Sequence, residues 1–404
     1  MGNGWFVPGM SILLLPIELI YAGAAPLHIV RGYMILVNLG ILYAVYSELL
    51  KLGMTRKLAT IAIALPFCIP MYLYYLGLVW GDLVGAHAAI LLCLFIERKL
   101  REGKETLLFC CLIGLLIAAL TFIRPQYFTL IAIVSLRIFF QYLDNNLILK
   151  RTVVGPLVLM LTFIVTIAPW QYALCSKHGL FFLVTSTEEK ALVFDEEYRA
   201  QAISENEKNK QGWISVHRKL QRDSRKRKIS LYENIKIEKN NMKPVPLSQR
   251  IKFQKAQTRI FYFNENKQIR MYISRDKNKP PNKIGTLGEK YILAINTFFW
   301  YLLFFLGCLF FIIPFTAKNQ NYTVPLFFKG LIFILASQPA FYFANSRYYV
   351  AMIPVFSIAI LIACSMGKPR WRPEKFNKSS TCVFLGELFC ILFVIYNLLV
   401  WGLG

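Results

Sequence analysis

Acidic residues and histidines are scarce in this sequence. Its 404 residues include 22 Asp and Glu, 4 His, and 46 Lys and Arg, which gives a formal net charge of +24 at pH 7. It contains no HExxH, GxSxG, Walker-type phosphate loop or GxGxxG, and no CxxC pair among its nine cysteines. The signatures of zinc hydrolases, serine hydrolases and nucleotide-binding enzymes are therefore missing, and we expect neither a metal nor a cofactor.

Disulfides and a cleavable targeting signal are not expected either. Most cysteines lie inside apolar runs, where they are expected to pack as small apolar residues. The amino-terminal stretch MGNGWFVPG lacks the basic start of a signal peptide.

Apolar residues, in contrast, are abundant and occur in long runs. The sequence is 56% hydrophobic and 15% aromatic, and only 17% of it is charged. Several runs reach the roughly 17 to 25 residues with which a helix crosses a hydrocarbon core. The sequence therefore predicts an all-α, multi-pass (polytopic) integral membrane protein. The ten predicted spans are 31–50, 58–76, 82–97, 106–123, 127–142, 152–169, 291–314, 323–342, 348–366 and 381–402.

The predicted spans form two groups separated by a polar segment. Residues 1–170 hold the amino-terminal transmembrane helices, 171–290 form an outer polar, basic loop region, and 291–404 hold the carboxy-terminal transmembrane helices. Residues 10–23, MSILLLPIELIYAG, are apolar but short and include Glu18. They are predicted to form an interfacial or re-entrant helix.

The short loops between the spans alternate in charge. Lys and Arg gather in every second loop, whereas the loops between hold single arginines. Since positive residues collect on the cytoplasmic side, the basic loops, such as 98–105 and 367–380, are predicted to be cytoplasmic. The residues that then fall on the outer side are Arg31, Asp82, Arg124, Trp170 and Arg347.

The segment 171–290 is the most polar part of the chain. Its stretch KLQRDSRKRKISLYENIKIEKNNMKPVPLSQRIKFQK is dense in Lys and Arg and poor in large apolar residues. One hypothesis is a partly ordered loop with short helices lying on the membrane. The other is a basic platform for an anionic acceptor or for lipid headgroups. Nucleic acid is not expected as a partner, because the basic residues are dispersed over this segment and the membrane-flanking loops.

Ionisable residues at span ends are candidate site residues, because burying them in a membrane is costly without a partner or water. Asp82, in LVWGDLVGAHAAILL, is either a base or positioning carboxylate at an outer cavity, or a helix-start acid favoured by the helix dipole. Arg124, in LTFIRPQYF, either binds phosphate through parallel hydrogen bonds or extends to the interface. His87 is expected to be a core histidine.

The stretch FANSRYYVAMIPVF places an arginine and two tyrosines between two apolar runs. Arg347 opposes the positive-inside trend, and together with Arg124 and Asp82 it suggests that an anionic ligand is bound at the outer face. Tyr348 is expected to assist by a hydrogen bond or by packing against lipid, and Tyr349 to anchor the helix at the membrane boundary. The alternative is that Arg347 only holds its helix at the interface.

Five stretches together resemble one family. They are GWFVPGMSILLLPIELIYAGAAPLHIVRGYMILVNLGILYAVY, GDLVGAHAAILLCLFIERKLREGK, LIAALTFIRPQYFTLI, IAPWQYALCSKHGLFFLVTST and NSRYYVAMIPVFSIAIL. They resemble, in order, a Pro-Gly segment with an Arg-headed span, a span with an acidic outer end, an Arg-Pro segment, a Pro-Trp span end followed by a short extended stretch, and an Arg-Tyr span start. This is the pattern of the GT-C glycosyltransferases that use polyprenyl-phosphate sugars, the protein O-mannosyltransferase-like and aminoarabinose-transferase-like bacterial enzymes.

The resemblance implies a GT-C-like helical bundle and glycosyl transfer at the outer face of a bacterial inner membrane. The donor would be a polyprenyl-phosphate sugar, and the acceptor a lipid, glycan or protein. Asp82 would be the catalytic carboxylate that deprotonates the acceptor hydroxyl for inverting attack on the sugar C1. Arg124, Arg347 and Tyr348 would bind the donor phosphate. The further residues expected to line the site are Glu18, Arg31 and Trp170.

One family feature has no counterpart here. The family opens with a span and an outer loop that carries an acidic catalytic residue, whereas no acidic residue precedes Glu18. The chain is therefore expected to lack that first span and loop. An inactive truncated transferase, a non-enzymatic handler or flippase of lipid-linked saccharides, and an unrelated transporter remain as alternatives. A transporter would be expected to place its polar residues at mid-membrane, not at one face.

Overall fold

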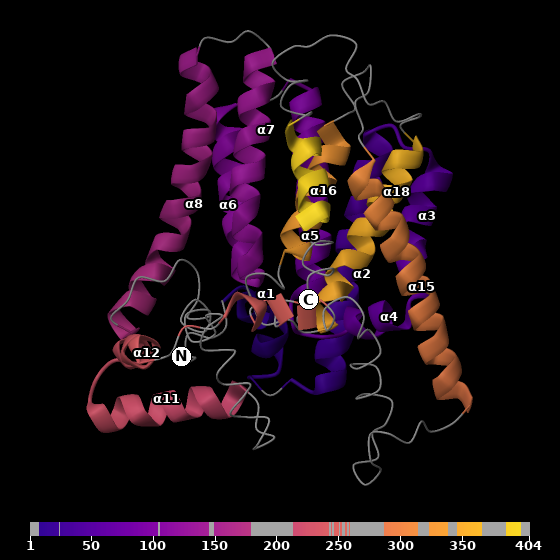
Figure 1. Ribbon diagram of the computed structural model, residues 1–404. Coiled ribbons are helices and arrows are strands. Elements are labelled where there is room, and N and C mark those ends of the chain that lie inside the picture. The colour runs from indigo at the N-terminus through magenta and orange to yellow at the C-terminus, as the bar shows by residue number, and fades with distance from the viewer. Residues whose placement is uncertain are drawn as a thin grey trace.

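The described part of the chain is built from helices, with no strand among its residues (Figure 1). The computed structural model describes residues 8–23, 25–103, 106–144, 149–178, 213–241, 244, 246–249, 251–252, 255–256, 258, 287–313, 323–337, 346–365 and 385–396. The elements are α1 (Gly9–Ile20), α2 (Leu27–Lys51), α3 (Arg56–Ala64), η1 (Leu65–Cys68), α4 (Pro70–Leu76), α5 (Asp82–Arg101), α6 (Leu107–Ile123), η2 (Pro125–Thr129), α7 (Leu130–Asp144), α8 (Leu149–His178), α11 (Trp213–Arg227), α12 (Leu231–Asn240), α15 (Leu287–Ile312), α16 (Thr323–Ala336), η4 (Ser346–Ala351), α18 (Met352–Ser365) and a final helix, Leu385–Tyr396.

Several of these helices are suited to a membrane, which agrees with the predicted all-helical membrane class. The three that are long and apolar enough to cross one, by length and composition, are Leu27–Lys51, Val153–Ala173 and Gly288–Ile312. The bent pair Arg56–Cys68 and Pro70–Leu76 makes a fourth if it forms one span. Six further apolar helices of the described residues have 10 to 17 residues each. Each predicted span contains a helix, but the count of ten crossings stays a prediction.

The predicted span 58–76 is not one straight helix. The α3–η1 segment meets α4 at an angle of 93°. Pro66 and Pro70 stand at the starts of η1 and α4, and a proline lacks the backbone donor that would continue the preceding helix. The predicted span 58–76 is therefore a bent helix pair, and whether it crosses the membrane stays a prediction.

Two other helices bear on the predicted boundaries. α1 has 12 residues, or about 18 Å at the rise of an α-helix, so it is too short to cross a membrane, as predicted for 10–23. α8 continues to His178 and contains Pro169 and Trp170 in its interior. The helix therefore continues beyond the predicted span end at residue 169, and the chain is helical as far as residue 178. Where the membrane span ends stays a prediction.

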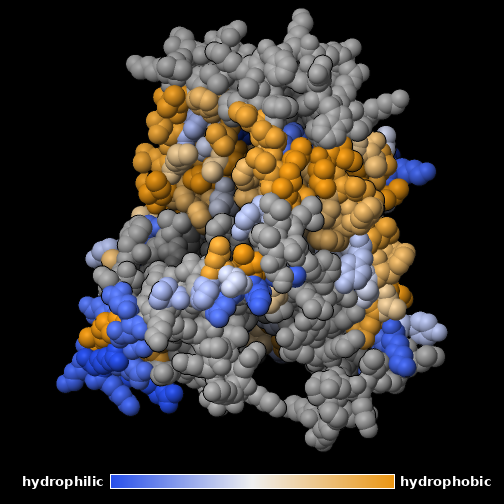
Figure 2. Space-filling view, viewed as in Figure 1, coloured by the Kyte–Doolittle hydropathy of each residue, from blue (hydrophilic) through white to orange (hydrophobic). Residues whose placement is uncertain are grey.

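α5 is the central helix of the bundle. Fourteen of its 20 residues are buried, and it packs against α2, α6, α16, α18 and η4. Large apolar side chains elsewhere stay exposed, for example Leu108 on α6, Leu161 on α8 and Phe298 on α15. Figure 2 shows apolar atoms as a band across the upper and middle part of the molecule. Exposed apolar surface of this extent suits contact with lipid chains.

The basic end of α5 is helical and ion-paired. α5 extends to Arg101, beyond the predicted span end. Arg98 donates to Glu48 of α2, with 2.6 Å between Nε and Oε2. Glu97, only 1% exposed, accepts hydrogen bonds from Arg101 and from Arg137 of α7, both at 3.2 Å. Arg98, predicted to start a loop, therefore holds α5 against α2, and Glu97, the last residue of the predicted span, holds α5 against α7.

A second charged pair is buried between α16 and the final helix. Lys329, fully buried, forms an ion pair with Glu387. Its Nζ also donates a hydrogen bond to the carbonyl oxygen of Ile313 at 2.6 Å. Both charged residues lie inside predicted spans, and neither was among the predicted site residues. Since an unpaired buried charge is costly, this pair fixes the final helix to α16.

We expect Lys329→Met to lower the free energy of unfolding by about 3 to 5 kcal/mol, because Glu387 would stay buried without its partner. Lys329→Met/Glu387→Met should recover most of that loss, since it removes both charges. Denaturant unfolding of the purified variants in detergent measures both values. Lys99→Met, which removes a partly exposed partner of Glu102, is the control and should change stability by at most about 1 kcal/mol. A double variant as unstable as the single one would contradict this role.

The predicted orientation in the membrane can be tested by cysteine labelling of residues at exposed positions. In Figure 1, α6, α7 and α8 lie side by side, and α11 and α12 lie at the lower end of the view. In a chain whose native cysteines are replaced, Arg225→Cys should react with an impermeant thiol reagent from outside the cell, and Lys57→Cys only after permeabilisation. Both positions are exposed. Labelling of Arg225→Cys from the cytoplasm alone would refute the predicted orientation.

Candidate functional site

Asp82 is the first residue of α5. The preceding Gly81 adopts a left-handed backbone with φ of 73°, which strains residues that carry a side chain. A Cβ at this position would also lie 3.0 Å from the sulfur of Met10 in α1. The positive end of the helix dipole favours a carboxylate at a helix start. Asp82 therefore lies at a helix start, as predicted; whether it also acts as a site carboxylate stays a prediction.

Arg124 completes the environment of Asp82. It ends α6 with an extended backbone, φ −146° and ψ 117°, because Pro125 disfavours a helical conformation in the residue before it. The chain then enters η2, and the guanidinium of Arg124 forms an ion pair with the carboxylate of Asp82. The two side chains are 17% and 2% exposed. The structure thus brings together two candidate residues that are 42 positions apart in the sequence.

Glycines allow the close packing around this pair. A methyl group on Gly85 would lie 2.9 Å from the ring of Tyr127 and 3.4 Å from Cγ of Arg124. A methyl group on Gly9 would lie 2.4 Å from the backbone of Phe122, near the end of α6. α1 therefore packs directly on the end of α6 and, through Met10, on the turn before Asp82.

Buried polar atoms at this end of the bundle have unused hydrogen-bonding capacity. Within the described residues, Oδ2 of Asp82 and Nε of Arg31 are buried and have no hydrogen-bond partner. Arg31 lies in α2, next to Gly77, the residue at which α4 ends. A buried polar group left unpaired costs about 1 to 3 kcal/mol. These atoms are therefore suited to a polar ligand, with Arg31 as a donor to an anion and Asp82 as an acceptor from a hydroxyl.

Glu18 and Trp170, predicted to line the site, are both half-buried. Glu18 belongs to α1, which packs against α6 and α2. The hydroxyl of Tyr33 in α2 donates to the carbonyl oxygen of Leu13 in α1 at 2.9 Å, which fixes α1 beside α2. Trp170 belongs to α8, which packs against α6 and α7. A direct role of Glu18 or Trp170 in the site stays a prediction.

Arg347 and Tyr348 lie in η4, which packs against α4, α5, α16 and α18. Their side chains lie outside the described part of the structure, so their proposed contact with phosphate stays a prediction. Tyr349 is described and is fully buried, with its ring 4.4 Å from that of Trp300. The prediction that Tyr349 anchors the helix at the membrane boundary was wrong, because aromatic packing in the core holds this side chain.

His87 is buried, as predicted, in a polar chain that the sequence did not reveal. Asn38 donates from its amide nitrogen to the carbonyl oxygens of Met34 and Leu76, both at 2.9 Å. Its amide oxygen must then accept from Nδ1 of His87 at 2.8 Å, which leaves Nε2 to accept from the Tyr72 hydroxyl at 2.9 Å. The chain joins α2, α4 and α5 through a neutral imidazole, so it positions α5 without adding charge to the site.

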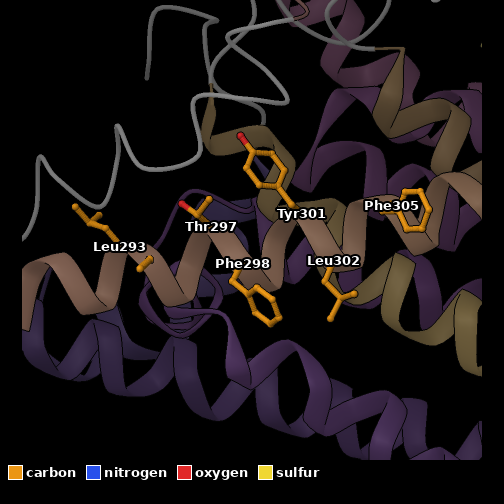
Figure 3. Close-up of a pocket in the computed structure, with 7 residues that line it drawn as sticks. Leu293, Thr297, Phe298, Tyr301, Leu302 and Phe305 are labelled. Carbon is orange, nitrogen blue, oxygen red and sulfur yellow. The ribbon is translucent and has the colours of Figure 1, made fainter.

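A hollow of about 710 Å³ lies along α15. Its lining residues are Leu293, Ala294, Thr297, Phe298, Tyr301, Leu302 and Phe305. Figure 3 shows that Thr297 and Tyr301 point to one side of the helix, and Phe298 and Leu302 to the other. No Asp, Glu, Lys, Arg or His belongs to this lining, so the hollow suits a lipid chain. We therefore assign the candidate site to the Asp82–Arg124 end of the bundle.

Comparisons with protein-family models, with curated proteins and with solved structures found no match. The similarity to GT-C glycosyltransferases therefore rests on the five sequence stretches quoted above. The candidate site rests on the geometry around Asp82 and Arg124.

The contact at Gly85 provides a test of the site's packing. Gly85→Ala should lower the free energy of unfolding by about 1 to 3 kcal/mol, because the added methyl group must displace Tyr127 or Arg124. Gly40→Ala in α2 is the matched control: its methyl group would meet no atom within 4 Å, so we expect a gain of about 0.5 to 1 kcal/mol. Unfolding in detergent measures both changes. A gain at Gly85 equal to that at Gly40 would contradict the described packing.

Proposed function

We propose that the protein is an integral membrane glycosyltransferase that moves a sugar from a polyprenyl-phosphate donor to a lipid, glycan or protein acceptor at the outer face of a bacterial inner membrane. The observation that carries this proposal is the buried ion pair between Asp82 and Arg124. Both residues lie in stretches that resemble the GT-C family. The pair joins a carboxylate and a phosphate-binding type of side chain at one end of an apolar bundle.

The position of the pair at helix ends supports a lipid-linked donor. A polyprenyl chain stays in hydrocarbon, whereas its phosphate stays at the level of the headgroups. Asp82 starts α5 and Arg124 ends α6. A pair at the ends of membrane helices would lie at the level of the headgroups, where the donor phosphate would be bound. Arginine suits this task because its planar guanidinium can donate two parallel hydrogen bonds to phosphate.

The transfer step assigns a separate role to each partner. Oδ2 of Asp82 would take the proton of the acceptor hydroxyl as the acceptor oxygen forms its bond to the sugar C1. The bond from C1 to the phosphate oxygen breaks at the same time, and its electron pair stays on the phosphate. Arg124, with Arg347 and Tyr348, would stabilise the charge that grows there. Arg31, whose Nε is buried without a described partner, is a further donor to the phosphate.

Handling of a lipid-linked saccharide without transfer is the second candidate function. The burial of Asp82, whose side chain is 2% exposed, favours it, because an acceptor hydroxyl must reach a catalytic base. α1 packs beside Asp82 through Met10. An active transferase must therefore expose Asp82 to the acceptor, whereas a protein that only binds the donor phosphate needs access to Arg124 alone.

Binding of two lipids that differ only in phosphate tests the proposal. The purified protein in nanodiscs should bind polyprenyl phosphate more tightly than polyprenol of the same length. Asp82→Asn/Arg124→Gln removes both charges without leaving either one unpaired, so the fold should be retained. This double variant should lose at least about tenfold in the preference for phosphate, since a hydrogen bond to a charged group is worth about 1.5 to 3 kcal/mol.

The matched control is Glu48→Gln/Arg98→Gln, which neutralises an ion pair at the other end of α5 and should keep the preference. Thermal unfolding of each variant checks the fold. A folded Asp82→Asn/Arg124→Gln variant with the parent's preference would show that the pair is only structural. With sugar-loaded donor and acceptor, release of polyprenyl phosphate supports transfer, and binding without release supports the second candidate.

A further inference from the structure

The helices α11 and α12 form a compact basic hairpin that the proposed reaction does not use. Residues 213–240 contain nine Lys and Arg against three Asp and Glu. Figure 2 shows hydrophilic residues gathered at the lower left of the view, where Figure 1 places α11 and α12, outside the apolar band. α11 runs across the direction of α6, α7 and α8 (Figure 1). If those helices cross a membrane, α11 lies parallel to the membrane plane.

Specific contacts hold the hairpin together. Asn234 of α12 donates to the carbonyl oxygen of Leu220 in α11 at 3.0 Å, and Arg227 donates to the side-chain oxygen of Asn234 at 2.8 Å. Arg227 also forms an ion pair with Glu238 at 3.1 Å. At the start of α12, Ser230 and Glu233 form a reciprocal capping box, with backbone-to-side-chain distances of 3.0 and 3.1 Å. The two helices therefore present a fixed surface.

The two faces of α11 differ in chemistry. Leu220 and Ser224, one helical turn apart, are buried at 2% and 6% exposed, so this face already packs within the hairpin. Arg222, Arg225 and Lys226 are exposed, and their spacing places them together on the opposite face. None of these three forms an ion pair with another described residue. The described exposed face of α11 therefore offers positive charge to a partner.

We propose that this basic face binds the anionic headgroups of the membrane surface around the protein. Each exposed Lys or Arg near an anionic leaflet contributes favourable electrostatic energy within about a Debye length. The orientation of α11 across the bundle helices, outside the apolar band, suits a lipid surface better than a polymer in solution. The exposed cations Arg222, Arg225 and Lys226 make this contact through their charge. This inference does not depend on the proposed transfer reaction.

Hydrogen–deuterium exchange of the full-length protein in nanodiscs tests the inference peptide by peptide. Backbone exchange across residues 213–240 should be slower in phosphatidylcholine that contains phosphatidylglycerol than in phosphatidylcholine alone. High salt should remove the difference, because the attraction is screened. Arg222→Gln/Arg225→Gln/Lys226→Gln should also remove it and speed exchange in the anionic discs about tenfold or more. Arg227 is left intact, because it holds the hairpin together.

The control variant is Arg56→Gln/Lys57→Gln, which removes two exposed basic residues from the start of α3 and should leave the lipid effect unchanged. If the triple substitution unfolds the hairpin, residues 213–240 of the variant will exchange fast even in phosphatidylcholine alone. In that case the unsubstituted protein decides: loss of its lipid effect at high salt supports the proposal, and an effect that salt does not change contradicts it. Exchange that is equal in the two lipid mixtures would overturn the proposal. Protection by an oligonucleotide, with none from phosphatidylglycerol, would overturn it in favour of a nucleic-acid partner.

Discussion

The central helix α5 is buried along its length and carries a charge near each end, and much of the bundle is arranged around the pairing of those charges. A charge removed from water needs a partner, or its burial becomes strongly unfavourable. Asp82 at the start of α5 pairs with Arg124, and Glu97 near its end pairs with Arg101 and Arg137. These partners come from the end of α6, from α5 itself and from α7. The pairing therefore holds the end of α6 beside the start of α5, and it joins α7 to α5.

The two ends of α5 differ in how fully their charges are satisfied. At the basic end, Glu97 accepts from two arginines, and Glu48 accepts from Arg98 and from Lys51. Those carboxylates are used in holding helices together. At the other end, Asp82 has one oxygen with no partner among the described residues. The physical difference is that the basic end is saturated, whereas the end with Asp82 keeps capacity for a ligand.

Three groups of polar residues differ in how they are satisfied. The difference depends on whether water can reach them. Lys329 and Glu387, inside the bundle, satisfy each other and a backbone carbonyl. The chain from Asn38 through His87 to Tyr72 satisfies its members without a net charge. Among the residues that the structure describes, the α11–α12 hairpin exposes several cations together. A buried group must find its partner inside the protein, whereas an exposed cation can take one from the surroundings.

The sequence by itself determined the all-helical class of the protein and where most of its apolar helices lie. Long apolar runs have few alternatives to helices in a membrane, and the Arg-Pro dipeptide at Arg124 indicated where α6 ends. Asp82 and Arg124 could be named because charges at the ends of apolar runs are conspicuous. Tertiary structure alone decided that these two residues pair, that Tyr349 packs on Trp300, and that α1 lies against the turn before Asp82. Lys329 and Glu387 could have been noticed inside their runs, but not matched to each other. The reason is physical: a hydropathy pattern depends on neighbours along the chain, whereas the partner of a buried charge comes from whichever helix packs beside it.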